Sequence, residues 1–109
     1  MPPKAEAVIQ LIDDNRKALE DLCLRYRVRR LEIFGSAVGG GFDPGSSDLD
    51  FLVEFEQLRD NEYADAYFGL LEDLKALFRR EVDLVVESAV KNPYLRQSIN
   101  RSRKLLYAA

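Results

Sequence analysis

Histidine is absent from the 109 residues, and cysteine occurs once. Without histidine the chain cannot form a histidine-based triad, use an imidazole general base or bind zinc through imidazole. A single cysteine, Cys23, excludes an internal disulfide. Cys23 lies among apolar residues at helical spacing, so we expect a buried side chain. Any chemistry in this chain therefore has to depend on carboxylates and metal ions.

Long apolar runs are also missing. No stretch is long enough to cross a bilayer, and the first residues, Met-Pro-Pro-Lys, do not resemble a signal peptide. A hydrophobic fraction of 47% and a charged fraction of 32% are typical of a globular protein. We therefore expect one cytoplasmic domain over residues 1–109, with no contact to membranes.

A large positive charge is missing as well, since the net charge is −3. A chain of this charge does not coat nucleic acid, and we expect no direct nucleic-acid binding. Residues 91–109 nevertheless hold five cations and no acid, which leaves −8 for the rest of the chain. This basic segment either meets a triphosphate or an acidic partner, or is a solvated helix face whose cations favour the helix C-terminus.

The periodicity of apolar residues predicts a small α/β domain with a mixed sheet, in the order α-β-β-α-β-α. Helical spacing predicts helices over residues 5–27, 61–79 and 92–107. The last of these begins with Asn92 as N-cap and Pro93 in the first turn. Alternating, β-favouring residues predict strands over 29–34, 48–55 and 81–87.

Two acidic residues open the second predicted strand. Asp48 and Asp50 are two positions apart, so both project to the same side. Adjacent carboxylates repel each other, and a hard divalent cation such as Mg²⁺ would remove the conflict. Upstream, Gly35-Ser36 end the first strand in a turn whose backbone can approach a phosphate closely. Ser36 could also cap a short helix and leave N–H groups facing outward.

A third acidic residue, Asp83, alternates with Val82 and Leu84 in the third predicted strand. It therefore points away from its apolar neighbours. Taken alone, Asp83 fits a solvated strand position, and Asp48-Leu49-Asp50 fits a polar turn that leads into a strand. The order of the whole set is the more informative feature.

The set of Gly35-Ser36, Asp48-Leu49-Asp50 and Asp83, within residues 29–86, resembles the signature of the DNA polymerase beta-like nucleotidyltransferases. The short chain resembles their smallest members, the minimal nucleotidyltransferases. The resemblance implies the polymerase beta-like fold and a two-metal mechanism. It also implies that Asp48, Asp50 and Asp83 hold two Mg²⁺ ions, and that Gly35 and Ser36 bind the triphosphate of ATP.

Two departures from the usual pattern concern the loop after Gly35-Ser36. Residues 37–47 place eleven residues before Asp48, where members commonly have ten. A basic residue that some members carry shortly after Gly-Ser is absent. One extra residue in a glycine-rich loop costs little. The missing positive charge has to come from the metals, the backbone, Lys91, Arg96, Arg101 or a second protein.

Stand-alone minimal nucleotidyltransferases resemble the antitoxins of toxin–antitoxin pairs whose toxin is a HEPN-domain ribonuclease. The resemblance implies a protein adenylyltransferase that transfers AMP from ATP to a tyrosine of the toxin, with which it forms a hetero-oligomer. Tyr94, Tyr107 and the C-terminal helix are a candidate partner surface, although core packing explains these residues equally well.

Two other functions stay open. The chain could neutralise the toxin by complex formation alone, or it could act on a small molecule such as an aminoglycoside. Three convergent carboxylates favour an enzyme, because a pure binding module does not need them. The chain shows no separate domain to hold a small-molecule acceptor.

Overall fold

The computed structural model describes residues 4–35, 38 and 48–109, and the side chains from residue 7 onward. Ser36 and the glycine-rich turns at 39–45 lie outside this description. The elements follow in the order α1 (Lys4–Asp14), α2 (Arg16–Arg25), β1 (Val28–Phe34), β2 (Leu49–Phe55), α3 (Asp60–Phe78), β3 (Val82–Val86), the short 3₁₀ helix η2 (Glu87–Ala89), α4 (Pro93–Ser102) and β4 (Lys104–Ala108).

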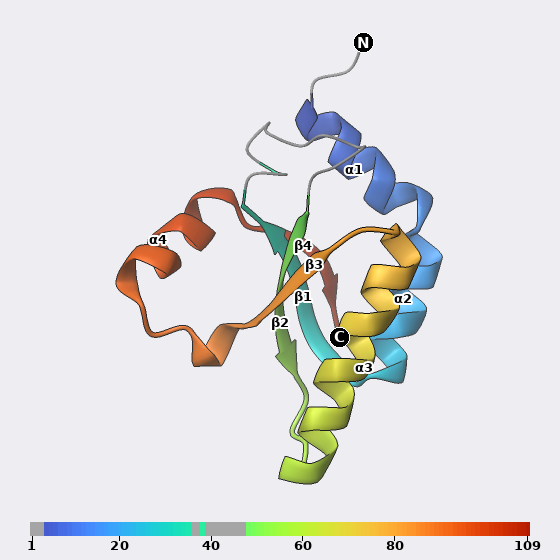
Figure 1. Cartoon of the computed structure of the whole chain (residues 1–109), viewed down its shortest axis with the longest axis vertical. Coiled ribbons are helices and arrows are strands. Elements are labelled where there is room, and N and C mark those ends of the chain that lie inside the picture. The colour runs from blue at the N-terminus through green and yellow to red at the C-terminus, as the bar shows by residue number, and fades with distance from the viewer. Residues whose placement is uncertain (1–3, 36–37, 39–47) are drawn as a thin grey trace.

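The strands form one mixed sheet in the order β3-β2-β1-β4 (Figure 1). β1 pairs antiparallel with both β2 and β4, whereas β2 and β3 are parallel. This confirms the predicted small α/β fold with a mixed sheet. Because β1 has a neighbour on each side, most of its side chains are buried.

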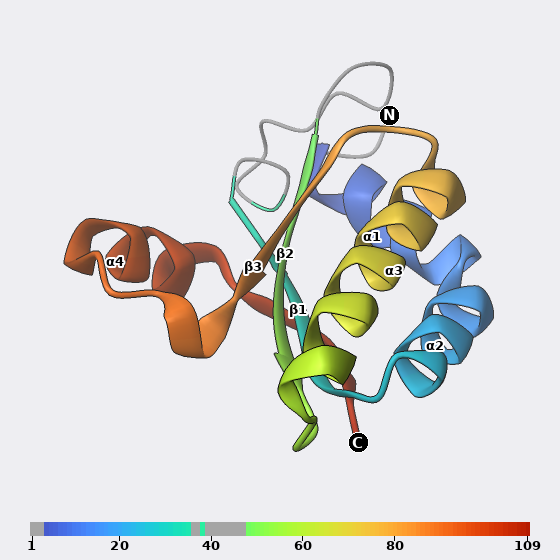
Figure 2. The ribbon, with the colours of Figure 1, turned by 60° about the horizontal axis from the view of Figure 1, so that its bottom comes forward.

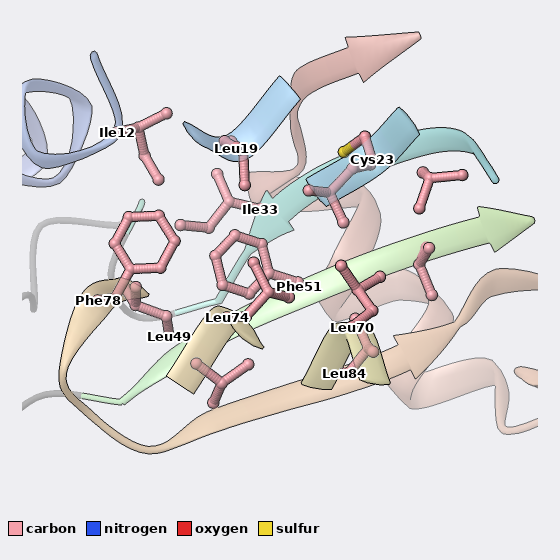
Figure 3. Packing of buried hydrophobic residues seen from close by; sticks show 14 of the residues in the cluster. Ile12, Leu19, Cys23, Ile33, Leu49, Phe51, Leu70, Leu74, Phe78 and Leu84 are labelled. Carbon is pink, nitrogen blue, oxygen red and sulfur yellow. The ribbon is translucent and has the colours of Figure 1, made fainter. Parts of the chain in front are cut away.

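Helices cover both faces of the sheet. Helices α1, α2 and α3 lie on one face and α4 lies alone on the other (Figure 2). The larger core fills the three-helix face, where the ring of Phe51 stacks on that of Phe78 with centroids 5.8 Å apart (Figure 3). A smaller cluster on the opposite face joins Phe34, Leu52 and Ile99. Ile99 is fully buried and anchors α4.

The structure corrects the single helix predicted over residues 5–27. The chain breaks at Asn15, whose φ and ψ of −114° and 16° are not helical. The Asn15 side chain donates to the carbonyl of Leu11 at 2.9 Å, and this local bond competes with continuation of the helix. The break lets α1 and α2 each bury its own apolar face on the curved sheet.

The predicted C-terminal helix over residues 92–107 is also wrong in its second half. Asn92 does cap α4, since its side chain accepts from the N–H of Tyr94 at 2.8 Å, but the helix ends at Ser102. Arg103 is extended, with φ of −60° and ψ of 135°. Residues 104–108 then pair with the free edge of β1, which gives their backbone partners that a helix end would lack.

None of the described helices is both long enough and apolar enough to span a membrane.

Candidate functional site

Two acidic side chains from neighbouring strands lie side by side on the sheet. In the parallel pairing of β2 and β3, Asp50 is the partner of Asp83. Asp50 shares its face of β2 with Leu52, which packs in the cluster under α4. The alternation read from the sequence is thereby confirmed. The strands bring Asp50 and Asp83 together on the α4 side, away from the larger core.

The surroundings of Asp50 change its acidity. Asp50 is half-buried, and its pKa is raised to about 6. Burial is the largest cause, followed by the negative charge of Asp83, a hydrogen bond with Asp83, and the charge of Asp48. Asp50 therefore keeps its proton up to about pH 6, and a cation bound beside it would favour the charged form instead. Oxygen donors of this kind suit Mg²⁺.

Gly35 closes the site at the end of β1. Its φ of 86° lies in the left-handed region, which glycine adopts without strain. A Cβ at this position would overlap the Asp50 carboxylate. Glycine is therefore needed here for close approach to Asp50 as well as for its backbone angle.

The N–H of Gly35 is already in use. It donates to the hydroxyl oxygen of Ser102 at 2.8 Å. The family resemblance implied that Gly35 binds the triphosphate. In this structure its N–H is engaged with Ser102 and is not free to donate to a phosphate. Gly35 belongs to the site because its backbone lies against the Asp50 carboxylate, where a side chain would not fit. Ser36, the other expected triphosphate contact, lies outside the described residues.

A cleft of about 590 Å³ opens over these residues. Its lining joins the end of β1 and the acidic pair to side chains of α3 and α4, and includes Gly35, Asp50, Asp83, Tyr67, Leu71, Leu95 and Ser98. A second cavity of about 190 Å³ lies between α1 and β4, but its lining contains no carboxylate. The first cleft is distinguished by the paired carboxylates of Asp50 and Asp83 in its lining.

Asp48 is exposed and immediately precedes β2. Its negative charge contributes to the raised pKa of Asp50, so the two carboxylates interact electrostatically. The described residues nevertheless contain no group of three acidic or cysteine side chains placed to hold one metal ion. Asp50 and Asp83 together suit a cation, and the participation of Asp48 stays a prediction.

The cations proposed to replace the missing basic residue differ in availability. Arg96 is engaged: its guanidinium contacts a Glu87 carboxylate oxygen at 3.2 Å and donates to the carbonyls of Glu87 and Val90. Lys91 and Arg101 are exposed. Of the three candidates, Lys91 and Arg101 remain the better ones.

An ion-pair cluster that the sequence analysis did not identify lies next to the site. Glu32, on β1, is 3% exposed and accepts from the guanidinium of Arg103, with Nε 3.1 Å from Oε2. Arg103 also contacts Glu87 at 2.8 Å. The only sequence signal was an acid in the middle of an apolar strand, since Glu32 lies between Leu31 and Ile33. Nothing in the sequence indicated that its partner would follow α4.

Comparison with known proteins matches residues 15–106 to the family model described as "Nucleotidyltransferase domain". Two relatives come from Methanocaldococcus jannaschii, where they carry the names "Putative protein adenylyltransferase MJ1379" and "Putative protein adenylyltransferase MJ0128". The first is 30% identical over 83% of this chain and 85% of its own length. The second is 36% identical over 86% of this chain and 92% of its own length.

Solved structures share the fold. One described as "Structure of putative minimal nucleotidyltransferase" is 32% identical, with a TM-score of 0.69 over 87% of this chain and 92% of the other. A second is the "tri-AMPylated Shewanella oneidensis HEPN toxin in complex with MNT antitoxin". It is 22% identical and has a TM-score of 0.61 over 89% of this chain and 72% of the other, a likeness of fold.

Proposed function

This chain belongs to the nucleotidyltransferase domain family, and from that premise we propose that it is a Mg²⁺-dependent protein adenylyltransferase. The observation that carries the proposal is the in-register pair of Asp50 and Asp83 in a cleft closed by Gly35. Burial, followed by the charge of Asp83, raises the pKa of Asp50 to about 6, and a site that binds no cation has little reason to retain such a pair.

The proposed reaction is the transfer of AMP from ATP to a hydroxyl group. The hydroxyl oxygen attacks the α-phosphorus, the bond to the β-phosphate oxygen breaks, and pyrophosphate leaves while the hydroxyl proton is lost to base or solvent. Asp50, Asp83 and, by the resemblance, Asp48 would hold two Mg²⁺ ions. Bound there, the ions would offset the charge of the triphosphate and favour in-line attack.

Asp83 and Tyr67 both lie at the cleft. Asp83 is exposed on β3, the edge strand of the sheet, so an acceptor can approach it from solvent. Tyr67 lines the same cleft, and its hydroxyl donates to the carbonyl of Leu84 at 2.7 Å. That bond holds α3 against β3 and fixes the wall of the cleft beside Asp83.

We propose a HEPN-domain toxin as the acceptor, with a tyrosine as the modified residue and the chain as its antitoxin. Support comes from the fold shared with the antitoxin that is complexed with a tri-AMPylated HEPN toxin. In the predicted partner surface, Tyr94 is 81% exposed and thus available. Tyr107 lies in β4 and packs against the core, so it is a weaker candidate.

Complex formation without catalysis is the second candidate function. It is favoured by large apolar side chains on the surface, because Phe68 of α3 is 61% exposed and Leu95 of α4 is 38% exposed. Exposed aromatic groups of this size often mark protein contacts. A site that only binds the toxin would not depend on Asp50 or on ATP.

The test follows α-labelled ATP in the presence of Mg²⁺ and the HEPN protein. The wild-type chain is expected to transfer label to the protein, and Asp50→Asn is expected to lose at least about 100-fold of the rate. Asp65→Asn, an exposed acid on α3, is the matched control and is expected to retain the rate. Equal transfer by Asp50→Asn, or none by the wild type, would refute the proposal.

A further inference from the structure

The junction between α4 and β4 lies behind the turn that closes the candidate site. The Ser102 hydroxyl accepts from the N–H of Gly35 at 2.8 Å, across 67 positions of sequence. It lies 3.4 Å from the carbonyl oxygen of Ser98, to which it donates. One hydroxyl thus ties the last turn of α4 to the end of β1.

Gly35 is held at both of its polar groups. Its N–H is bound by Ser102, and its carbonyl accepts from the N–H of Val38 at 3.2 Å. Glycine has more backbone freedom than any other residue, so a turn built on it needs such contacts to keep one conformation. Ser102 supplies the contact that comes from a distant part of the chain.

The conformation of Gly35 matters because of what it touches. Its Cα faces the carboxylate of Asp50 so closely that a Cβ would overlap an oxygen of that group. Gly35 is also the last described residue before Ser36. A change in its backbone angles would alter the wall beside Asp50.

Ser102 is itself firmly placed. The preceding turn of α4 is anchored by fully buried Ile99. The next residue, Arg103, is bound by Glu32 of β1 and by Glu87 of η2. These contacts fix the end of α4 on β1 and η2, so the hydroxyl has little freedom to leave Gly35.

We propose that Ser102 is a positioning residue of the nucleotide site, which acts by holding the Gly35 turn against Asp50. This inference rests on the proposed function. Ser102 touches neither the cation nor the acceptor in this scheme. Its effect is to keep the turn in the shape that receives the triphosphate, so its loss reduces nucleotide affinity.

The test compares Ser102→Ala with Ser102→Thr, which keeps the hydroxyl. Gln97→Ala, an exposed position on the same helix, is the matched control. The first readout is the hydrogen exchange of the Gly35 amide, which reports the hydrogen bond without any catalysis. We expect exchange to be about tenfold faster in Ser102→Ala, and unchanged in Ser102→Thr and Gln97→Ala.

The second readout is the kinetics of AMP transfer to the HEPN protein. In Ser102→Ala we expect the KM for ATP to rise about tenfold, the scale typical of a lost supporting contact. A purely structural role would reduce the folded fraction and hence kcat while leaving KM unchanged. Ser102→Thr is expected to restore the KM. Thermal melting of each variant checks that the fold is intact.

Two kinds of failure are distinguishable. If the wild-type chain transfers AMP and Ser102→Ala does so with the same KM, Ser102 does not position the site and the inference is overturned. If the wild-type chain transfers no AMP at all, the proposed function itself fails. An unchanged Gly35 exchange rate in Ser102→Ala would also overturn the inference, because the hydrogen bond would then not restrain the turn.

Discussion

At the scale of single residues, two acidic groups of this chain behave in opposite ways. Burial alone would raise the pKa of Glu32, but hydrogen bonds and charge from Arg103, helped by Arg30, outweigh it and lower that pKa. Glu32 therefore stabilises the fold above its unfolded pKa, and this contribution is lost as the pH falls. Asp50 is half-buried without a cationic partner among the described residues, and its pKa is raised to about 6.

The raised pKa of Asp50 predicts a cost to stability at neutral pH. The native state binds a proton more tightly than the unfolded chain between pH 3.8 and about 6, so stability falls as the pH rises through that window. Asp50→Asn removes the charge. Measured in EDTA at pH 7, we expect it to be more stable than wild type by on the order of 1–2 kcal/mol, after allowance for solvent screening.

Urea denaturation at pH 4 and at pH 7 checks this expectation. The advantage of Asp50→Asn should shrink at pH 4, where the wild-type carboxyl is mostly protonated in the native state. Asp65→Asn, which removes an exposed charge of the same sign, controls for net charge. An Asp50→Asn variant that is less stable than wild type at pH 7 would contradict the electrostatic account of the site.

Substitution of Arg103, the partner of Glu32, is expected to destabilise the fold, whereas Asp50→Asn is expected to stabilise it. Arg103→Met leaves the Glu32 carboxylate buried with only Arg30, 3.3 Å away, to compensate its charge. We expect a loss of about 3 kcal/mol of unfolding free energy at pH 7, since a broken buried ion pair leaves an uncompensated charge. The loss should diminish in acid, where Glu32 becomes neutral.

Arg101→Met, an exposed cation two positions earlier, provides the comparison in the same denaturation experiment. It is expected to change stability by less than about 0.5 kcal/mol. Equal losses for the two variants would show that Arg103 acts through general charge and not through Glu32.

At the scale of the elements, the sequence predicted those whose pattern is local. The alternation of β2 and β3 placed Asp50 and Asp83 on one face, and Asn92-Pro93 marked the start of α4. The strand β4 was missed because it depends on a distant partner, β1, and the break at Asn15 was missed because the local bond to Leu11 is joined there by a distant contact. Arg16, beside the break, donates to the carbonyl of Leu106 at 2.8 Å, a contact across 90 positions of sequence.

The same reasoning applies to the site. The shared face of Asp50 and Asp83 could be predicted from strand alternation, whereas their role in a site rests on the family resemblance. The role of Ser102 could not, because its hydroxyl matters only once α4 is seated beside β1. Glu32 gave a weak signal as an acid within an apolar strand, but its partner could not be identified from the sequence.

Packing between α2 and α3 gives a prediction at this scale. Gly69 of α3 faces Tyr26, whose hydroxyl donates to Asp73, and a Cβ on Gly69 would lie 2.5 Å from the Tyr26 ring. Gly69→Ala has two opposing effects on stability. Better helix propensity stabilises the fold by about 1 kcal/mol, and overpacking destabilises it by about 1–3 kcal/mol. We expect overpacking to prevail and the variant to be less stable in urea denaturation.

A second substitution separates the two effects. In a Tyr26→Ala background the ring is absent, so Gly69→Ala should become neutral or stabilising. If Gly69→Ala stabilised the otherwise wild-type chain, α2 and α3 would not pack as closely as described.

At the scale of the whole molecule, the fold gives the basic C-terminal segment two roles. Arg96 and Arg103 are paired with Glu87 and Glu32, so part of the positive charge is structural. Lys91, Arg101 and Lys104 are exposed and are the cations of this segment available to a triphosphate or an acidic partner. The ion pairs of Arg96 and Arg103 were not among the interpretations of the composition, and contact of the exposed cations with a triphosphate or an acidic partner stays a prediction.

Under the proposed function, the arrangement of α3 and α4 around the cleft suits a large acceptor. Residues of both α3 and α4 line the cleft. These helices lie on opposite faces of the sheet, in which β3 is an edge strand (Figures 1 and 2). Exposed apolar side chains, Phe68 on α3 and Tyr94 on α4, occur on both of these helices. A protein acceptor can contact such surfaces while it presents one hydroxyl to Asp83.

The proposed function requires that this chain transfers AMP to a protein. The most direct measurement is the intact mass of the HEPN protein after incubation with the wild-type chain, ATP and Mg²⁺. We predict a gain of one or more AMP units, which is absent when Asp48→Asn and Asp50→Asn are combined. A stable complex with the HEPN protein at unchanged mass would contradict it and would establish neutralisation by binding alone.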